Sequence, residues 1–208
     1  MVGYRYYLGM HLVFGYGGQD TRLREIWIGG TNGASGADKV WSGNLGEGAD
    51  KIKKLSLWGG DEEGGGISGG FNFFPGGPSQ GRSDYLIKQL GNKVPSYRGV
   101  CGIVWNGGYH GNRTVIQQWA ARIENLPNKL GTPYSNINGE ANAAEMQYDL
   151  LTNSDYGMGL TADEIDLESF RKVAKTLHEE GHGLSLVWDN VKSLEEMQKE
   201  IDRHVDAL

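Results

Sequence analysis

The chain has 208 residues, a formal net charge of −6 and 34 glycines. Its acidic balance gives no reason to expect specific nucleic-acid binding through a basic face, and no apolar run approaches the ~18 residues of a membrane span. Cys101 is the one cysteine, which excludes an intrachain disulfide and suits folding in a reducing compartment. The glycines lack a collagen-like period and lie mostly before residue 115 among aromatic and β-branched residues, which indicates strands joined by turns.

Strict alternation predicts a long strand over residues 4–16 and a second strand over residues 23–28. One face of the first strand would carry Tyr4, Tyr6, Leu8, Met10, Leu12 and Phe14. In the second strand, one face would carry Leu23, Glu25 and Trp27, and the other Arg24, Ile26 and Ile28. Shorter strands are expected at 39–41 and 52–58, with residues 43–50 as the loop between them.

The segment 69–86 combines a strand, a wide turn and the start of a short helix. Phe71 and Phe73 suit a half-buried strand, and the Pro-Gly-Gly-Pro sequence at 75–78 ends it. Ser83 or Asp84 would cap a helix at 85–90 that stops at Gly91. Strands are expected next at 97–105 and 115–123, with a long turn at 106–112. This unit is predicted to be scaffold.

The segment 127–139 is polar and broken by prolines and glycines, which predicts a domain boundary. The expected domains are 1–126, rich in antiparallel strands, and 127–208, a smaller helix-rich α+β part. Helices are predicted at 140–151 and at 193–208. A further helix between them is predicted to end at about residue 180, and a strand is predicted at 184–188. Their boundary signals are Thr161 with Glu164, Asp166 with Ser169, Gly181, and Ser193 with Glu196. The apolar stripe of the last helix runs to residue 208, so we expect the natural chain to continue.

The sequence from His178 to His182 matches the zinc-protease pattern His-Glu-x-x-His. That chemistry needs two imidazoles one turn apart on a continuous helix, with the glutamate beside the metal-bound water. Gly181 is predicted to end the helix before the second imidazole, which favours a plain helix terminus. A zinc-dependent hydrolase that uses His178, Glu179 and His182 is the alternative.

Three further sets of residues have both a structural and a chemical interpretation. Cys101 and His110 would form a nucleophile and its base, or Cys101 would be a core thiol. The carboxylates at 61–63 would bind a metal, or form a solvated loop. Aromatic side chains near the turns would stack on sugar rings in a glycan-binding β module, or fill cores; these are Trp27, Trp41, Trp58, Trp105 and Tyr109.

Several blocks of sequence occur together, in order, from about residue 4 to the end. They are Tyr6–Val13, Arg24–Ile28, Gly76–Leu86, Val94–Val100, Leu150–Asn153, Tyr156–Gly159, Ile165–Phe170 and Gly181–Trp188. In combination they resemble the hub region of phage tail-tip proteins. These are the tip attachment (host specificity) proteins of long-tailed phages and the related hubs of gene-transfer agents.

The resemblance implies a non-enzymatic structural protein of the virion tail tip, assembled in the host cytoplasm. A homotrimer would form a ring of β-barrel-like hub domains that closes the tail tube and continues into receptor-binding parts. Its implied partners are distal tail and tail-tube proteins, other tail-tip proteins and the tape measure, and DNA would pass through without specific binding. No catalytic, cofactor-binding or metal-binding residue is implied. Such hub proteins are usually much longer, so this chain is expected to be one piece of a larger protein.

Overall fold

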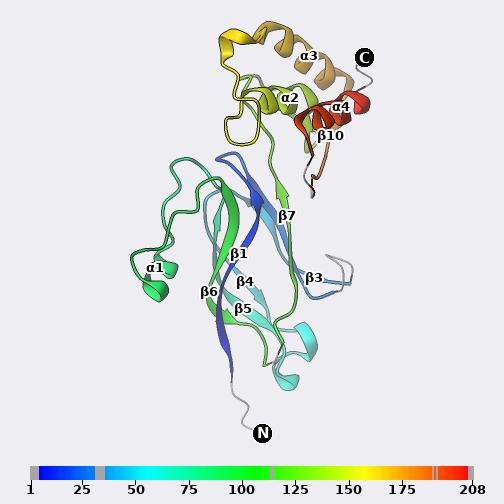
Figure 1. Ribbon diagram of the computed structural model, residues 1–208. Helices are drawn as coiled ribbons and strands as arrows, with labels where there is room; N and C mark the ends of the chain where they lie inside the picture. The colour runs from blue at the N-terminus through cyan, green and yellow to red at the C-terminus, as the bar shows by residue number, and fades with distance from the viewer. Residues whose placement is uncertain (1–4, 31–35, 113–114, 189, 191, 206–208) are drawn as a thin grey trace. The chain divides into compact units, whose positions relative to one another are not determined.

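The structure is a computed structural model that describes residues 5–30, 36–112, 115–188, 190 and 192–205 (Figure 1). It is a mixed α+β fold with antiparallel sheets and, in the described ranges, four α-helices. The chain divides into two compact units, Met1–Asn125 and Leu126–Leu208, here called unit 1 and unit 2. This division lies within one residue of the boundary that the Pro- and Gly-rich segment predicts. Each unit has its own hydrophobic core.

The described strands of unit 1 form two antiparallel sheets (Figure 1). One sheet has the order β1-β6-β5-β4 and the other has the order β3-β2-β7. The strands are β1 (Tyr7–Tyr16), β2 (Arg22–Ile28), β3 (Asp38–Leu45), β4 (Gly48–Lys54), β5 (Ile67–Phe74), β6 (Val100–Tyr109) and β7 (Trp119–Glu124). No closed barrel is found among them, so barrel closure stays an expectation from the resemblance.

Side chains from both sheets share one core, as in a sandwich. Its buried members are Leu23, Ile26, Ile28, Val40, Ile52, Ile67, Phe71, Phe73, Cys101, Ile103 and Trp105. Met10, Leu12 and Phe14 of β1 pack against this core, as their alternation predicts. A sheet buries every second residue because successive side chains point to opposite faces.

The predicted faces of β2 are wrong at Leu23. Leu23, Ile26 and Ile28 are all fully buried, whereas Glu25 and Trp27 are only partly buried. The pairing of β2 with both neighbouring strands shifts between Leu23 and Glu25. A bulge inserts one extra residue, so the side chains after it change face.

The boundaries of other strands also differ from the expected ones: β3 extends to Leu45, and β7 begins at Trp119 instead of residue 115. β4 begins at Gly48, inside the segment expected to be a loop, and it ends at Lys54 instead of residue 58. It pairs with β5 residue by residue from Gly48 to Lys54. β6 starts at Val100 and continues to Tyr109, through most of the expected turn. In both places pairing with a neighbouring strand overrides the weak strand propensity of glycine.

Residues 75–99 leave the sheet after β5 and return to it at β6; we call this segment the excursion. It contains α1 (Asp84–Leu90), whose first turn is capped by Ser83 as predicted. Leu86 and Val94 pack with Val104 on the face of the sheet opposite the main core. The hydroxyl of Tyr85 lies only 2.2 Å from where a Cβ on Gly9 would stand, so this glycine makes room for the excursion.

A buried amide holds the excursion together. Gln80 is fully buried, and its Oε1 accepts a hydrogen bond of 2.6 Å from the backbone N–H of Gly76. Its Nε2 donates to the carbonyl oxygens of Ser96 at 2.7 Å and Tyr97 at 3.1 Å. One side chain therefore links the start of the excursion to its end, and each buried bond stabilises the segment by about 1 kcal/mol.

Unit 2 packs three helices against a small antiparallel sheet of order β10-β9-β8 (Figure 1). Its elements are β8 (Asn136–Ile137), β9 (Glu140–Asn142), α2 (Ala143–Thr152), η3 (Ala162–Glu164), α3 (Leu167–Glu180), β10 (Gly183–Leu184) and α4 (Leu194–His204). The predicted capping signals at Thr161, Asp166 and Ser193 are all present. The helix expected from Glu140 begins three residues later, because Glu140–Asn142 pairs with β8 and β10.

The strand expected at residues 184–188 is present only as Gly183–Leu184. Its partner β9 spans only three residues, and β10 lies at the edge of the sheet. The following Ser185–Trp188 has a suitable strand sequence, but no described strand pairs with it. The last helix ends at His204, and residues 206–208 of the prediction lie outside the described residues.

Candidate functional site

The structure does not arrange the zinc-protease pattern as a metal site. His178 lies in the last turn of α3, and the helix ends at Gly181, whose φ of 73° suits glycine. The side chain of His182 follows this end and is 62% exposed. The ring of His178 instead lies 5.3 Å from the ring of Tyr134. The two imidazoles are therefore not one turn apart on a continuous helix, as the pattern requires.

Glu179, the glutamate of the proposed zinc site, lies 3.6 Å from Lys175 as an exposed i,i+4 pair. Within the described ranges, no three His, Cys, Asp or Glu side chains come together as metal ligands would. In the acidic segment 61–63, Asp61 accepts two hydrogen bonds from Arg5, of 2.6 and 2.8 Å. This segment is a short 3-10 helix, η2 (Asp61–Glu63), on the surface.

The proposed cysteine nucleophile and its base lie at opposite ends of β6. Cys101 is the second residue of that strand, and His110 comes directly after its last residue. Nine residues of extended chain span about 30 Å, so the thiol and the imidazole cannot share a proton. The Cys101 thiol lies in the core, and burial raises its pKa. The nucleophile–base hypothesis is therefore wrong, and the alternative of a core thiol holds.

His110 belongs to an aromatic cluster at the edge of the unit 1 core. Its Nε2 accepts a hydrogen bond of 3.1 Å from the indole N–H of Trp119, and the two rings are stacked 5.8 Å apart. The ring centre of Trp58 lies 5.5 Å from that of His110, and the ring of Trp105 meets the ring of Trp119 edge-on. Burial lowers the pKa of His110, so the neutral ring is the form that this cluster accommodates.

We expect acid to destabilise unit 1 partly through His110. Because its pKa is lower in the folded state than the ordinary 6.5, unfolding takes up a proton below that pH. The free energy of unfolding therefore falls as the pH drops from 6.5 toward the folded pKa. Urea unfolding followed by tryptophan fluorescence at pH 7.5 and 5 should show a smaller pH dependence for His110→Gln. The exposed His182→Asn is the matched control, and an unchanged dependence in His110→Gln would contradict this role.

The five aromatic residues considered for sugar stacking are mainly packed inside unit 1. Trp105 and Tyr109 are buried, and Trp41 and Trp58 pack against the core. Trp27 is partly buried, and the ammonium group of Lys39 lies 4.7 Å from its ring centre. Among these described residues the structure offers no row of neighbouring exposed rings. Core packing therefore accounts for them, and a glycan-binding platform has no structural support here.

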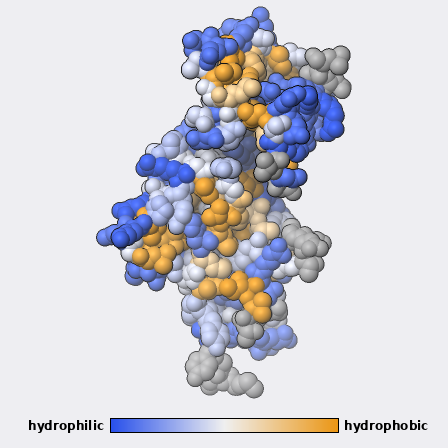
Figure 2. Space-filling view, viewed as in Figure 1, coloured by the Kyte–Doolittle hydropathy of each residue, from blue (hydrophilic) through white to orange (hydrophobic). Residues whose placement is uncertain are grey.

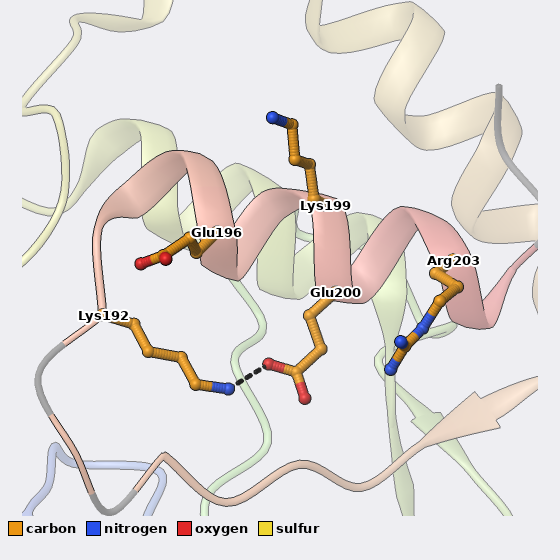
Figure 3. A pocket seen from close by; sticks show the side chains of 5 residues that line it. All are labelled: Lys192, Glu196, Lys199, Glu200 and Arg203. Carbon is orange, nitrogen blue, oxygen red and sulfur yellow. Dashed lines mark hydrogen bonds and ion pairs between the residues drawn. The ribbon is translucent and has the colours of Figure 1, made fainter.

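A shallow hollow of about 370 Å³ lies on α4 and is lined by charged side chains (Figure 3). Lys192 lies 2.6 Å from Glu200, which also accepts a hydrogen bond of 3.0 Å from the indole N–H of Trp188. The contact with Lys192 lowers the pKa of Glu200. Arg203 points to the same side of the helix, whereas Lys199 projects away (Figure 3). Both carboxylates of this hollow already have partners, Glu200 in Lys192 and Glu196 in the backbone N–H of Ser193. The lining lacks the apolar walls of a typical ligand site.

A buried carboxylate organises unit 2, and the sequence reasoning missed it. Glu145 of α2 is fully buried, and its Oε2 accepts backbone N–H bonds from Lys129 at 2.8 Å and Leu130 at 3.1 Å. Its Oε1 has no hydrogen-bond partner in the described part of the chain. Burial raises the pKa of Glu145, and these N–H donors and the Thr132 side chain partly oppose that shift.

One turn later on the same helix, Asp149 lies 2.5 Å from the ammonium group of Lys129 and accepts a hydrogen bond from the Tyr156 hydroxyl. Burial and this carboxylate raise the pKa of Tyr156. Glu145 and Asp149 thus fix two segments against α2: Lys129–Leu130, which precedes the sheet, and the loop after α2 that contains Tyr156. A signal was present in the sequence, since acidic residues at i and i+4 share one face of a helix.

β1 presents an open edge of unit 1. It lies at the end of its sheet and carries no formal charge over its ten residues, with His11 neutral. Val13 is 56% exposed and Tyr16 is 78% exposed. Two bulges interrupt its pairing with β6 and leave a regular stretch from Met10 to Val13. An edge strand without charges is a ready template for pairing with another chain.

The opposite edge of the same sheet is protected. β4 carries three lysines, Lys51, Lys53 and Lys54, and all three are exposed. Lysines on an edge strand disfavour pairing with a further strand. The two edges of this sheet therefore differ in chemistry, and only β1 combines exposed apolar side chains with an uncharged backbone edge.

Charge is divided unequally between the two units, which the sequence reasoning also missed. Residues 1–125 hold 13 Lys and Arg against 10 Asp and Glu, a formal charge of +3. Residues 126–208 hold 7 Lys and Arg against 16 Asp and Glu, a formal charge of −9. The net charge of the whole chain does not show this asymmetry. Counting the charged residues of each predicted domain separately would have shown it.

None of the helices in the described ranges combines the length and apolar composition needed to cross a bilayer. The residues considered for the zinc site and for the cysteine nucleophile are not brought together in the described part of the chain. The distinctive surfaces of the structure are the β1 edge and the charged faces. Comparisons with protein families and with curated proteins give no match.

Proposed function

We propose that this chain is a structural component of a bacteriophage tail tip. It would act as a baseplate-hub protein that forms a trimeric ring, closes the tail tube and links it to receptor-binding parts. In this proposal the two sheets of unit 1 supply the barrel-like hub domain of the ring. The function is the burial of protein surface between copies and neighbouring virion proteins, and no bond chemistry is involved.

The observation that carries this proposal is the exposed, uncharged β1 edge. In an isolated molecule, a ten-residue edge strand with exposed apolar side chains promotes aggregation, because it can pair with strands of other chains. In a protein that assembles with other chains, the same edge can form a contact between subunits. The blocks of sequence that resemble tail-tip hubs include most of this strand, residues 6–13.

Light scattering of the purified chain during size-exclusion chromatography tests the assembly. We expect a particle of three times the 22.8 kDa chain mass, and negative-stain images that show a ring. Antibodies raised against the chain should label the tail tips of virions that encode it. A stable monomer together with labelling away from the tail would overturn the proposal.

A further inference from the structure

The excursion, residues 75–99, is a basic surface on an otherwise mixed unit. Its basic residues are Arg82, Lys88, Lys93 and Arg98, and all four are exposed. Its one acidic residue is Asp84, so the segment has a formal charge of +3. Apolar side chains lie among these charges: Leu90 is 71% exposed, and Tyr97 is also exposed. Hydrophilic and apolar side chains lie next to one another over α1 (Figure 2).

The excursion holds this surface in a defined shape. Arg82 donates a hydrogen bond of 2.8 Å to the carbonyl oxygen of Asn92, which joins the two sides of α1. Arg98 donates to the carbonyl oxygen of Gln80 at 3.3 Å, beside the buried amide network. The ring of Tyr97 lies 4.5 Å from His11 of β1. An ordered charged surface loses less conformational entropy on binding than a flexible loop would.

Unit 2 has the complementary chemistry. Between Lys129 and Arg171 the sequence contains eight acidic residues and no Lys or Arg. The exposed stretch from Asp155 to Glu168 holds five of these carboxylates. It also includes Met158, whose side chain is 53% exposed. Each surface therefore joins exposed apolar groups with charges that are mainly of one sign, Asp84 in the excursion being the exception, and the two main signs are opposite.

We infer that the excursion of one molecule docks on the acidic surface of unit 2 in a second copy of this chain. The contact joins two different surfaces, so each molecule offers one to each neighbour, and repetition closes a ring. Opposite charges would set the register and speed the encounter, while Leu90 and Met158 add buried apolar area. This inference rests on the proposed trimeric assembly and names the surfaces that build it.

Charge reversal on each side tests the contact. We expect Lys88→Glu with Lys93→Glu to weaken self-association by about tenfold or more at low salt, because like charges would then face each other. Asp155→Lys with Asp163→Lys should have the same effect. A variant that carries all four substitutions should assemble again, since each contact in the ring then pairs a reversed excursion with a reversed unit 2 surface. Lys51→Glu with Lys53→Glu on β4 is the control of equal charge change.

The outcomes separate this contact from the assembly itself. Restored assembly in the variant with all four substitutions, lost again in high salt, supports the inference. Wild-type assembly that survives both reversals would overturn the inference and leave the trimeric function intact. A variant with all four substitutions that circular dichroism shows to be folded but that fails to assemble would also overturn it. A wild-type chain that stays monomeric at every salt concentration would overturn both the inference and the proposed function.

Discussion

Val13→Lys, alone and with Tyr16→Lys, is expected to convert the assembled chain into folded monomers. Both side chains are largely exposed, so the substitutions should cost little folding stability. Lysine on the β1 edge would instead oppose strand pairing, as the lysines of β4 do on the other edge. Light scattering should show the mass falling to a third of the wild-type value, with an unchanged circular dichroism spectrum.

Leu55→Lys is the matched control for this experiment. Leu55 is half exposed, so the change removes a similar apolar group and adds the same charge. It follows the end of β4 and lies outside the regular strands. The control should therefore keep the wild-type mass. An assembly that tolerates lysine on β1 would show that this edge is not a contact between copies.

Glu145→Ala is expected to destabilise unit 2 by about 2–4 kcal/mol, because the buried N–H groups of Lys129 and Leu130 would lose their acceptor. Glu145→Gln keeps an acceptor oxygen and removes the buried charge, so it should cost much less. Urea unfolding followed by circular dichroism at 222 nm measures both variants, since three of the four described α-helices lie in unit 2.

The pH dependence of these variants gives a second readout. Because the pKa of Glu145 is higher in the folded state than the ordinary 4.5, folding takes up a proton between those two values. The wild-type chain should therefore gain stability from this group as the pH falls toward 4.5, and Glu145→Gln should lack that gain. Glu179→Gln, at an exposed position, should follow the wild type. If Glu145→Gln and Glu145→Ala were equally unstable, the carboxylate would not act as an acceptor.

Local signals in the sequence were sufficient for most helix ends. Ser83 caps α1, Gly181 ends α3, and Ser193 with Glu196 forms the capping box of α4, each as predicted. These signals work within a few residues, since a cap bonds to the first or last turn of its own helix. The inward positions of Met10, Leu12 and Phe14 in β1 were also predictable, because alternation needs no information beyond the strand itself. Tyr6 of the same predicted face is 61% exposed, and Tyr4 lies outside the described residues.

The candidate sites were harder to judge from sequence. The sequence from His178 to His182 does match the zinc-protease pattern, but the helix ends at Gly181, so the two histidines do not lie on one continuous helix. Cys101 and His110 looked close in sequence, yet an extended strand places them far apart. The spacing of Glu145 and Asp149 placed them on one face of α2, but the burial of Glu145 was not visible in the sequence, because its partners Lys129 and Leu130 come from a segment about fifteen residues earlier that folds back on α2.

The sequence by itself determined the α+β composition, the helix caps and the inward positions of Met10, Leu12 and Phe14 in β1. Only the tertiary structure decided the bulge beside Leu23, the pairing of Glu140–Asn142 and the absence of a partner for Ser185–Trp188 among the described strands. The reason is physical. A cap or an alternation is satisfied by neighbours in the chain, whereas a strand register or a buried carboxylate is satisfied only by groups that folding brings from elsewhere.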